Sequence, residues 1–220
     1  GILSLDDNYR ITGFQEKPKY PNSNYASMGI YIFNWPILNK ALVDDQESKY
    51  SNYDFSKDII PSLLEEKKRI FAYEFKGYWK DCGTIDSYYD SQMALLEDVP
   101  DFDIFNQEVK IYSNTSVTKP HHIDVNGSVK QSLVANISYI GGHVKHSVIS
   151  NDSYIGENAV VEDSILLPGS RVLRNAIVKY AIIGENSIIQ NNSHFIGTKE
   201  NIKLIGDLKS FKTARKDLGL

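Results

Sequence analysis

The apolar positions of this chain follow two patterns, and the change comes near residue 128. Up to about residue 96, short β-prone runs alternate with segments of helical periodicity, which is typical of an α/β domain. From Val129 onward, apolar residues recur every five or six positions instead. We therefore predict an α/β region at 1–96, a connector at 97–128, a repeat region at 129–197 and a helical tail at 198–220.

Boundary signals divide the first region into strands and helices. Thr84 and Asp54 are good helix N-caps, whereas Pro61 is awkward inside the helix that Asp54 begins. Gly1 opens on a bare hairpin strand without an initiating Met, so we expect further sequence upstream. The predicted strands are 2–5, 9–14, 27–33 and 69–75, and the predicted helices are 35–43, 54–64 and 85–96.

The repeat region has a period of 17 residues. Val144, Val161 and Val178 are 17 apart, and the first coil, from Val129 to Val144, is two residues shorter. Three apolar steps per repeat describe a triangular coil with a short strand on each face and small or polar residues at each corner. Such a coil buries its apolar face only by stacking on its neighbours, so we predict a parallel β-helix. The other columns are Ile149, Leu166 and Ile183, and Ile155, Val172 and Ile189.

The composition of the chain argues against several classes of protein. Hydrophobic residues make up 41% and charged residues 24%, and the formal net charge of -4 gives no general attraction to nucleic acid. No apolar run reaches the ~18 residues of a membrane span, and no signal peptide is visible. The single cysteine, Cys82, excludes an internal disulfide and favours a cytoplasmic protein. We interpret Cys82 as buried and inert.

Two stretches carry groups that suit a sugar phosphate. In Phe14–Pro18, the Glu16 carboxylate accepts hydrogen bonds from hydroxyl groups and Lys17 offers a compact positive charge to phosphate. Ser27 opens the next apolar run, where its hydroxyl is placed to bond to a sugar. Without further context, the first stretch also fits a surface turn of mixed charge, and the second a buried strand with a bulge at Gly29.

Two further stretches surround helix starts. The run 54–61 fits a capped helix that packs on a sheet, with a structural role. The run 78–84 ends a strand and begins a helix, and Asp81 is suited to Mg²⁺, which prefers carboxylate oxygens. The alternative for Asp81 is a helix cap.

Taken in order and at this spacing, these stretches resemble the sugar nucleotidyltransferases, and within them the bacterial ADP-glucose pyrophosphorylases (glucose-1-phosphate adenylyltransferases). The residues that carry the resemblance are 14–18, 26–31, 54–61 and 78–89, and the coils extend it to about Gly197. It implies part of a Rossmann-like α/β nucleotidyltransferase domain, followed by a left-handed parallel β-helix that takes part in subunit contacts and allosteric regulation. Members of the family form homo- or hetero-oligomers, and the family assembly is a tetramer.

The resemblance also implies an activity and a site. The family joins ATP and glucose 1-phosphate into ADP-glucose and pyrophosphate for glycogen biosynthesis, with Mg²⁺ as cofactor. Glu16 and Ser27 would then hold the glucose, Lys17 its phosphate, Trp79 would shape the wall near the sugar, and Asp81 would bind Mg²⁺. We expect Lys17 and Asp81 to converge on one pocket.

One departure changes the expected activity. The family's Gly-rich nucleotide loop has no equivalent in these residues, so we expect the 220-residue chain alone to be inactive and some apolar surface to lie uncovered. The open alternatives are a pyrophosphorylase for another nucleotide sugar, a regulatory non-catalytic paralogue, an assembly module, and a hexapeptide acyltransferase. The candidate histidines for the last are His121, His122, His143, His146 and His194.

Overall fold

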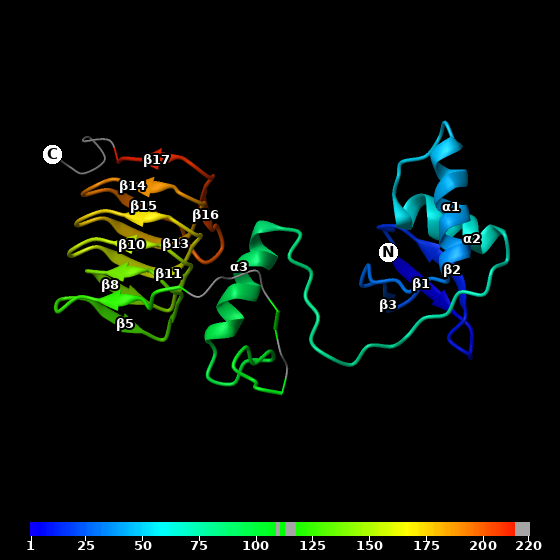
Figure 1. The fold of residues 1–220 in the computed structure, drawn as a ribbon, viewed down its shortest axis with the longest axis horizontal. Coiled ribbons are helices and arrows are strands. Elements are labelled where there is room, and N and C mark those ends of the chain that lie inside the picture. Colours follow the sequence, from blue (N-terminus) through cyan, green and yellow to red (C-terminus); the bar gives the residue numbers. More distant parts are fainter. Residues whose placement is uncertain (109–110, 113–117, 214–220) are drawn as a thin grey trace. The chain divides into compact units, whose positions relative to one another are not determined.

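A computed structural model describes residues 1–108, 111–112 and 118–213, which form two compact units (Figure 1). The first unit is Gly1–Trp79, and the second begins at Lys80. The predicted helix at 85–96 therefore groups with the β-helix and not with the α/β region in which the sequence placed it. No helix in the described part of the chain is both long and apolar enough to cross a bilayer.

The first unit contains a three-stranded antiparallel sheet in the order β2-β1-β3. Its strands are β1 (Ile2–Leu5), β2 (Ile11–Gln15) and β3 (Tyr25–Ala26). The predicted hairpin is confirmed. Its turn is held by the Asp6 carboxylate, which accepts from the backbone N–H groups of Asn8 and Arg10, both at 2.9 Å.

The helices of the first unit begin close to where the sequence predicted them, and a capping side chain marks the second start. They are α1 (Trp35–Glu47), a π-helical turn (Phe55–Ile59) and α2 (Ile60–Glu65). The Asp54 carboxylate accepts from the N–H groups of Ser56 and Lys57, at 2.7 and 3.1 Å. Pro61 falls in the first turn of α2, where its missing N–H leaves no helical hydrogen bond unmade.

Two predicted strands are wrong. The run 27–33 forms no strand, and Ile30 and Ile32 are 71% and 100% exposed. The run 69–75 makes only an isolated bridge, between Arg10 and Phe71. A strand requires partners for its backbone groups, and in the run 27–33 the described residues supply a backbone partner only for Ser27, the Gly1 carbonyl. The expected uncovered apolar surface is confirmed in this unit, where Trp35 and Tyr73 are also exposed.

The second unit is a parallel β-helix whose strands stack coil on coil (Figure 1). The strands are β4 (His122–Ile123), β5 (Ser128–Lys130), β6 (Leu133–Val134), β7 (Tyr139–Ile140), β8 (His143–Lys145), β9 (Val148–Ile149), β10 (Tyr154–Ile155), β11 (Val160–Leu166), β12 (Arg171–Val172), β13 (Ile177–Ile183), β14 (Ile188–Ile189), β15 (His194–Ile196), β16 (Lys203–Ile205) and β17 (Ser210–Phe211).

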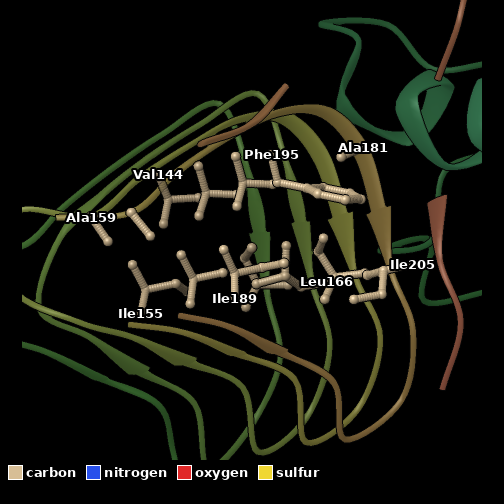
Figure 2. Close-up of a cluster of buried hydrophobic side chains, with 14 of the residues drawn as sticks. Val144, Ile155, Ala159, Leu166, Ala181, Ile189, Phe195 and Ile205 are labelled. Atoms are coloured by element: carbon tan, nitrogen blue, oxygen red, sulfur yellow. The ribbon is translucent and has the colours of Figure 1, made fainter. Parts of the chain in front are cut away.

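Strand register confirms the 17-residue repeat. Val161 pairs with Val144 on one side and Val178 on the other, and Leu166 pairs with Ile149 and Ile183 in the same way. These side chains point inward and form rows along the coil axis (Figure 2). At one corner, residues 158, 175 and 192 are asparagines with φ of 55°, 57° and 57°, the left-handed region that asparagine tolerates.

The predicted helical tail is wrong for the residues that the structure describes. Residues 203–205 and 210–211 form β16 and β17, so the stack continues past residue 197. Ile205 pairs with Ile183, and Phe211 with Ile189, which gives this last coil its inward residues. Arg215 and Lys216 of the predicted tail lie outside the described residues.

Helix α3 (Ile85–Met93) continues as a 3₁₀ turn (Ala94–Leu96) and packs on the outside of the β-helix. Thr84 is the N-cap, as the sequence predicted, and it forms a reciprocal capping box with Ser87. The Tyr89 hydroxyl donates to the backbone carbonyl of Asp163 at 2.6 Å. The apolar contact between the helix and the coils is made by Tyr89, Met93, Leu96, Ile165 and Ile182.

Candidate functional site

The register of the first sheet brings Glu16 and Ser27 to opposite sides of Gly1. Ile2 pairs with the residue before Glu16 on β2 and with the residue before Ser27 on β3. The Gly1 carbonyl accepts from the Ser27 N–H at 2.8 Å, and the Gly1 amino group lies 3.4 Å from Glu16 Oε2. Two residues far apart in the sequence therefore flank the same end of β1.

Oε2 of Glu16 forms an ion pair with the Gly1 amino group at 3.4 Å but makes no hydrogen bond in the part of the chain that the structure describes. The Glu16 side chain is only 24% exposed, and Oε2 itself is buried. A buried acceptor without a partner is costly and rare in native proteins. The hydroxyl of a bound sugar is the kind of donor that this oxygen lacks.

Lys17 lies beside Glu16 in an unusual backbone conformation. Its φ is 45°, in the left-handed region that residues other than glycine seldom adopt and that occurs often at functional sites. The side chain is exposed and makes no ion pair with any residue that the structure describes. The ammonium is therefore free to meet an anion.

Ser27 belongs to a row of hydroxyl groups that the sequence did not reveal. Its Oγ accepts from the N–H of Gly29 at 3.2 Å and lies 3.4 Å from the Tyr31 hydroxyl. Tyr31 in turn lies 3.4 Å from Ser56 Oγ and stacks on Phe55, with ring centroids 5.8 Å apart. The stretch 54–61, which we read as structural, thus adjoins the candidate site.

The division of the chain into two units separates Asp81, but not Trp79, from Glu16 and Ser27. Trp79 ends the first unit on a segment without helix or strand and is 44% exposed, and Asp81 belongs to the second unit. The convergence of Lys17 and Asp81 stays a prediction, as do the roles of all five site residues.

Asp81 has one carboxylate oxygen engaged locally. Oδ1 accepts from the N–H of Gly83 at 2.9 Å in the turn before α3, whereas the cap of the helix itself is Thr84. The described residues contain no group of three or more metal-ligating side chains. Mg²⁺ is commonly held by one or two carboxylates together with waters and substrate phosphates, so Asp81 fits as one ligand of such a site.

Cys82 is exposed, so the prediction that it is buried was wrong. It lies in the extended segment before α3, where packing does not cover it, and its Sγ is 3.3 Å from Ser91 Oγ.

Three of the five histidines make contacts between neighbouring coils. His143 Nδ1 lies 2.8 Å from Ser128 Oγ, His146 Nδ1 lies 2.6 Å from Asp163 Oδ1, and the ring of His122 stacks on a tyrosine of the next coil. These contacts account for the three side chains as parts of the stack and do not favour the acyltransferase alternative.

Comparison with known proteins gives the class to which this architecture belongs. Residues 1–98 match the nucleotidyl transferase family, and residues 108–216 match the GlmU-like C-terminal hexapeptide family. The chain therefore joins a nucleotidyl transferase segment to a hexapeptide-repeat β-helix.

Curated relatives cover both segments together. The chain is 39% identical over 214 residues to the glucose-1-phosphate adenylyltransferase of Desulfitobacterium hafniense (strain DSM 10664 / DCB-2). The aligned region makes up 94% of this chain and 54% of that relative. It is 42% identical over 202 residues to the enzyme of that name from Acetivibrio thermocellus. That aligned region makes up 92% of this chain and 47% of the relative. The chain is thus similar to glucose-1-phosphate adenylyltransferases along nearly all of its own length, and it spans about half the length of the curated relatives that it matches.

Proposed function

We propose that this chain is the sugar-phosphate-binding and β-helix part of an enzyme that makes ADP-glucose and pyrophosphate from ATP and glucose 1-phosphate, for glycogen biosynthesis in the cytoplasm. Two kinds of observation support the proposal: relatives of that name match both segments of the chain, and the first sheet places Glu16, which precedes the exposed Lys17, and Ser27 on either side of Gly1.

The observation that carries the assignment of a sugar site is the buried Glu16 Oε2 without a hydrogen-bond partner among the described residues. In this proposal, a glucose hydroxyl donates to that oxygen, and the Ser27 hydroxyl contacts the sugar. Tyr31 and Ser56 fix the direction of the Ser27 hydroxyl through the row of contacts described above.

Lys17 holds the phosphate of glucose 1-phosphate. The phosphate oxygen attacks the α-phosphorus of ATP and displaces pyrophosphate, so the residues have to position and neutralise the reactants and form no covalent bond with them. Mg²⁺, when bound with Asp81 as one ligand, offsets the charge of the phosphates. Trp79 forms part of the wall beside the sugar. The active enzyme is an oligomer, a tetramer as in its family, whose β-helix takes part in allosteric regulation.

The decisive test uses a longer protein that contains this chain and the Gly-rich nucleotide loop. We expect Lys17→Gln to raise the KM for glucose 1-phosphate by about 10- to 100-fold, the loss of one hydrogen bond to a charged group, while the KM for ATP changes little. Pyrophosphate release is the readout. The matched control is Lys19→Gln, an exposed lysine two residues away, which should leave both constants unchanged.

Two results would contradict the proposal. An equal effect of Lys17→Gln and Lys19→Gln would remove the assigned phosphate contact. Faster turnover with another nucleoside triphosphate or another sugar phosphate would replace ADP-glucose as the product. The 220-residue chain alone should release no pyrophosphate, and activity from it would show that the nucleotide is held by residues within this chain.

A further inference from the structure

One corner of the β-helix is two residues shorter in one coil than in its neighbours. Between β7 and β8 the chain turns through Gly141 and Gly142 alone, whereas four residues join β4 to β5, β10 to β11 and β12 to β13. This short corner accounts for the first coil of 15 residues. Corners of equal length cover one another in a stack, so the short one leaves a notch between its neighbours, with a volume of about 360 Å³.

The backbone at the short corner is packed tightly against the next coil. A Cβ on Gly142 would lie 2.3 Å from the Ala159 carbonyl oxygen and 2.7 Å from that of Gly156, closer than any real contact. Gly141, which lines the notch, would bring a Cβ to 3.0 Å from the ring of Tyr139. The notch is therefore a fixed feature of the stack and not a loop that closes.

Polar groups from five successive coils line the notch. Among the described residues, the lining is Asp124, Asn126, Tyr139, Gly141, Tyr154, Glu157, Leu173, Arg174 and Asn191. The rings of Tyr139 and Tyr154 stack on each other with centroids 5.2 Å apart, which fixes their hydroxyl ends. Leu173 is the single aliphatic side chain among these described lining residues.

One carboxylate in the notch is held in a fixed orientation. Asp124 accepts from the Tyr139 hydroxyl through Oδ2 and from the N–H of Val125 through Oδ1, the latter at 2.6 Å. The hydrogen bond from Tyr139 holds the pKa of Asp124 below its ordinary value, so the group is ionised at neutral pH. A fixed carboxylate of this kind accepts from a ligand hydroxyl at little entropic cost.

The charges in the notch exclude several classes of ligand. Asp124 and Glu157 face one guanidinium, that of Arg174, whose Nε lies 3.9 Å from Glu157 Oε2. The two carboxylates repel a phosphate, and an apolar ligand would leave the polar lining without hydrogen bonds. A ligand with many neutral hydroxyl groups both donates to the carboxylates and accepts from Arg174, Asn126 and Asn191.

We propose that this notch binds a neutral sugar, as a single hexose unit or the end of a neutral oligosaccharide. Its volume is at the lower end of small-molecule pockets, which run from about 300 to 1,000 Å³, and suits one or two rings. The site lies entirely in the second unit and does not depend on the adenylyltransferase activity proposed above.

The test follows backbone amide resonances of the 220-residue chain during titration with glucose and, separately, with inorganic phosphate. We expect glucose to shift Gly141 and Gly142 in a saturable way, with a dissociation constant on the order of millimolar. Phosphate should leave these resonances unchanged. Binding at the site in the first unit appears separately, at Ser27 and Gly29, so the failure of either proposal is recognised without the other.

Three variants make the test specific. Insertion of Glu-Asn between Gly141 and Gly142 restores the four-residue corner seen at 156–159 and should abolish the glucose shifts by filling the notch. Glu157→Ala should weaken binding about tenfold without altering the fold. Asp152→Asn removes an exposed carboxylate at another corner, where it pairs with Arg171 at 3.8 Å, and should change nothing.

The proposal fails on any of three results: no shift of Gly141 and Gly142 by glucose at concentrations on the order of 100 mM, larger shifts there with phosphate than with glucose, or undiminished glucose binding in Glu157→Ala. Because Glu157 is exposed at the rim, that last variant remains informative even when the insertion prevents folding.

Discussion

The two compact units of this chain bury their apolar residues in very different ways. In the β-helix, inward residues such as Ile140, Ile155 and Ile183 are 0% exposed, and one row continues into the next coil. In the first unit, Ile59 and Leu63 are buried, yet Ile32 is 100% exposed. In the repeat, the partner of each strand comes from the adjacent coil of the same segment. A mixed α/β sheet draws its partners from distant segments, and the described residues leave part of the first unit without them.

The largest expected effect tests this contrast directly. Leu166→Ala removes a fully buried side chain from the stack and should lower the free energy of unfolding by about 3 kcal/mol, because the surrounding coils cannot close the cavity. Ile32→Ala in the first unit should change it by less than about 0.5 kcal/mol. Urea unfolding followed by circular dichroism measures both. A large loss from Ile32→Ala would mean that this side chain is covered in solution.

The same contrast explains how much of the fold the sequence predicted. The spacing of Val144, Val161 and Val178 was sufficient for the coils because each pairing is with a residue one period away. The run 27–33 is also rich in β-prone residues but has no partner one period away, and the prediction of a strand failed there. The end of the stack was missed because Leu166, Ile183 and Ile205 are separated by 17 and then 22 residues, which breaks the period.

The candidate site was predictable only in part, for a related reason. Glu16 and Ser27 stand in stretches whose chemistry is visible in the sequence, but their positions on either side of Gly1 depend on strand register. Tyr31 and Ser56 carried no signal of their own, since a tyrosine in an apolar run and a serine after a helix cap are ordinary residues. The sequence showed the shortened first coil, but only the stacked corners of the structure showed that the shortening leaves a notch.

A smaller effect bears on which unit helix α3 joins. Tyr89→Phe removes the hydrogen bond to the Asp163 carbonyl and should cost about 1 kcal/mol of stability in the second unit. The control is Tyr88→Phe, since the half-buried Tyr88 packs on the same cluster and its hydroxyl makes no hydrogen bond to the residues that the structure describes. Hydrogen exchange of the α3 amides should rise only in Tyr89→Phe. Equal protection in both variants would show that apolar packing alone holds the helix.

The smallest effect concerns the charges on the outside of the coils. Glu162 on one coil accepts from Lys145 on the coil before, at 2.7 Å, and from Lys179 on the coil after, at 2.6 Å. The hydrogen bonds from Lys145 and Lys179 lower the pKa of Glu162 from 4.5 to about 2. A carboxyl whose pKa is lower in the folded state binds its proton more readily when unfolded, so its stabilisation is complete above pH 4.5 and is lost as the pH falls toward 2.

Glu162→Gln should therefore lower the free energy of unfolding at pH 7 by about 0.5 to 1 kcal/mol, the range for partly exposed ion pairs. The difference from the wild type should shrink between pH 4.5 and pH 2, as measured by urea unfolding at each pH. Glu157→Gln is the matched control, because its pair with Arg174 is long, at 3.9 Å, and both side chains are more than half exposed. A difference for Glu162→Gln that grows in acid would reverse the assigned sign. It would show that the pKa of Glu162 is raised, not lowered, in the folded state.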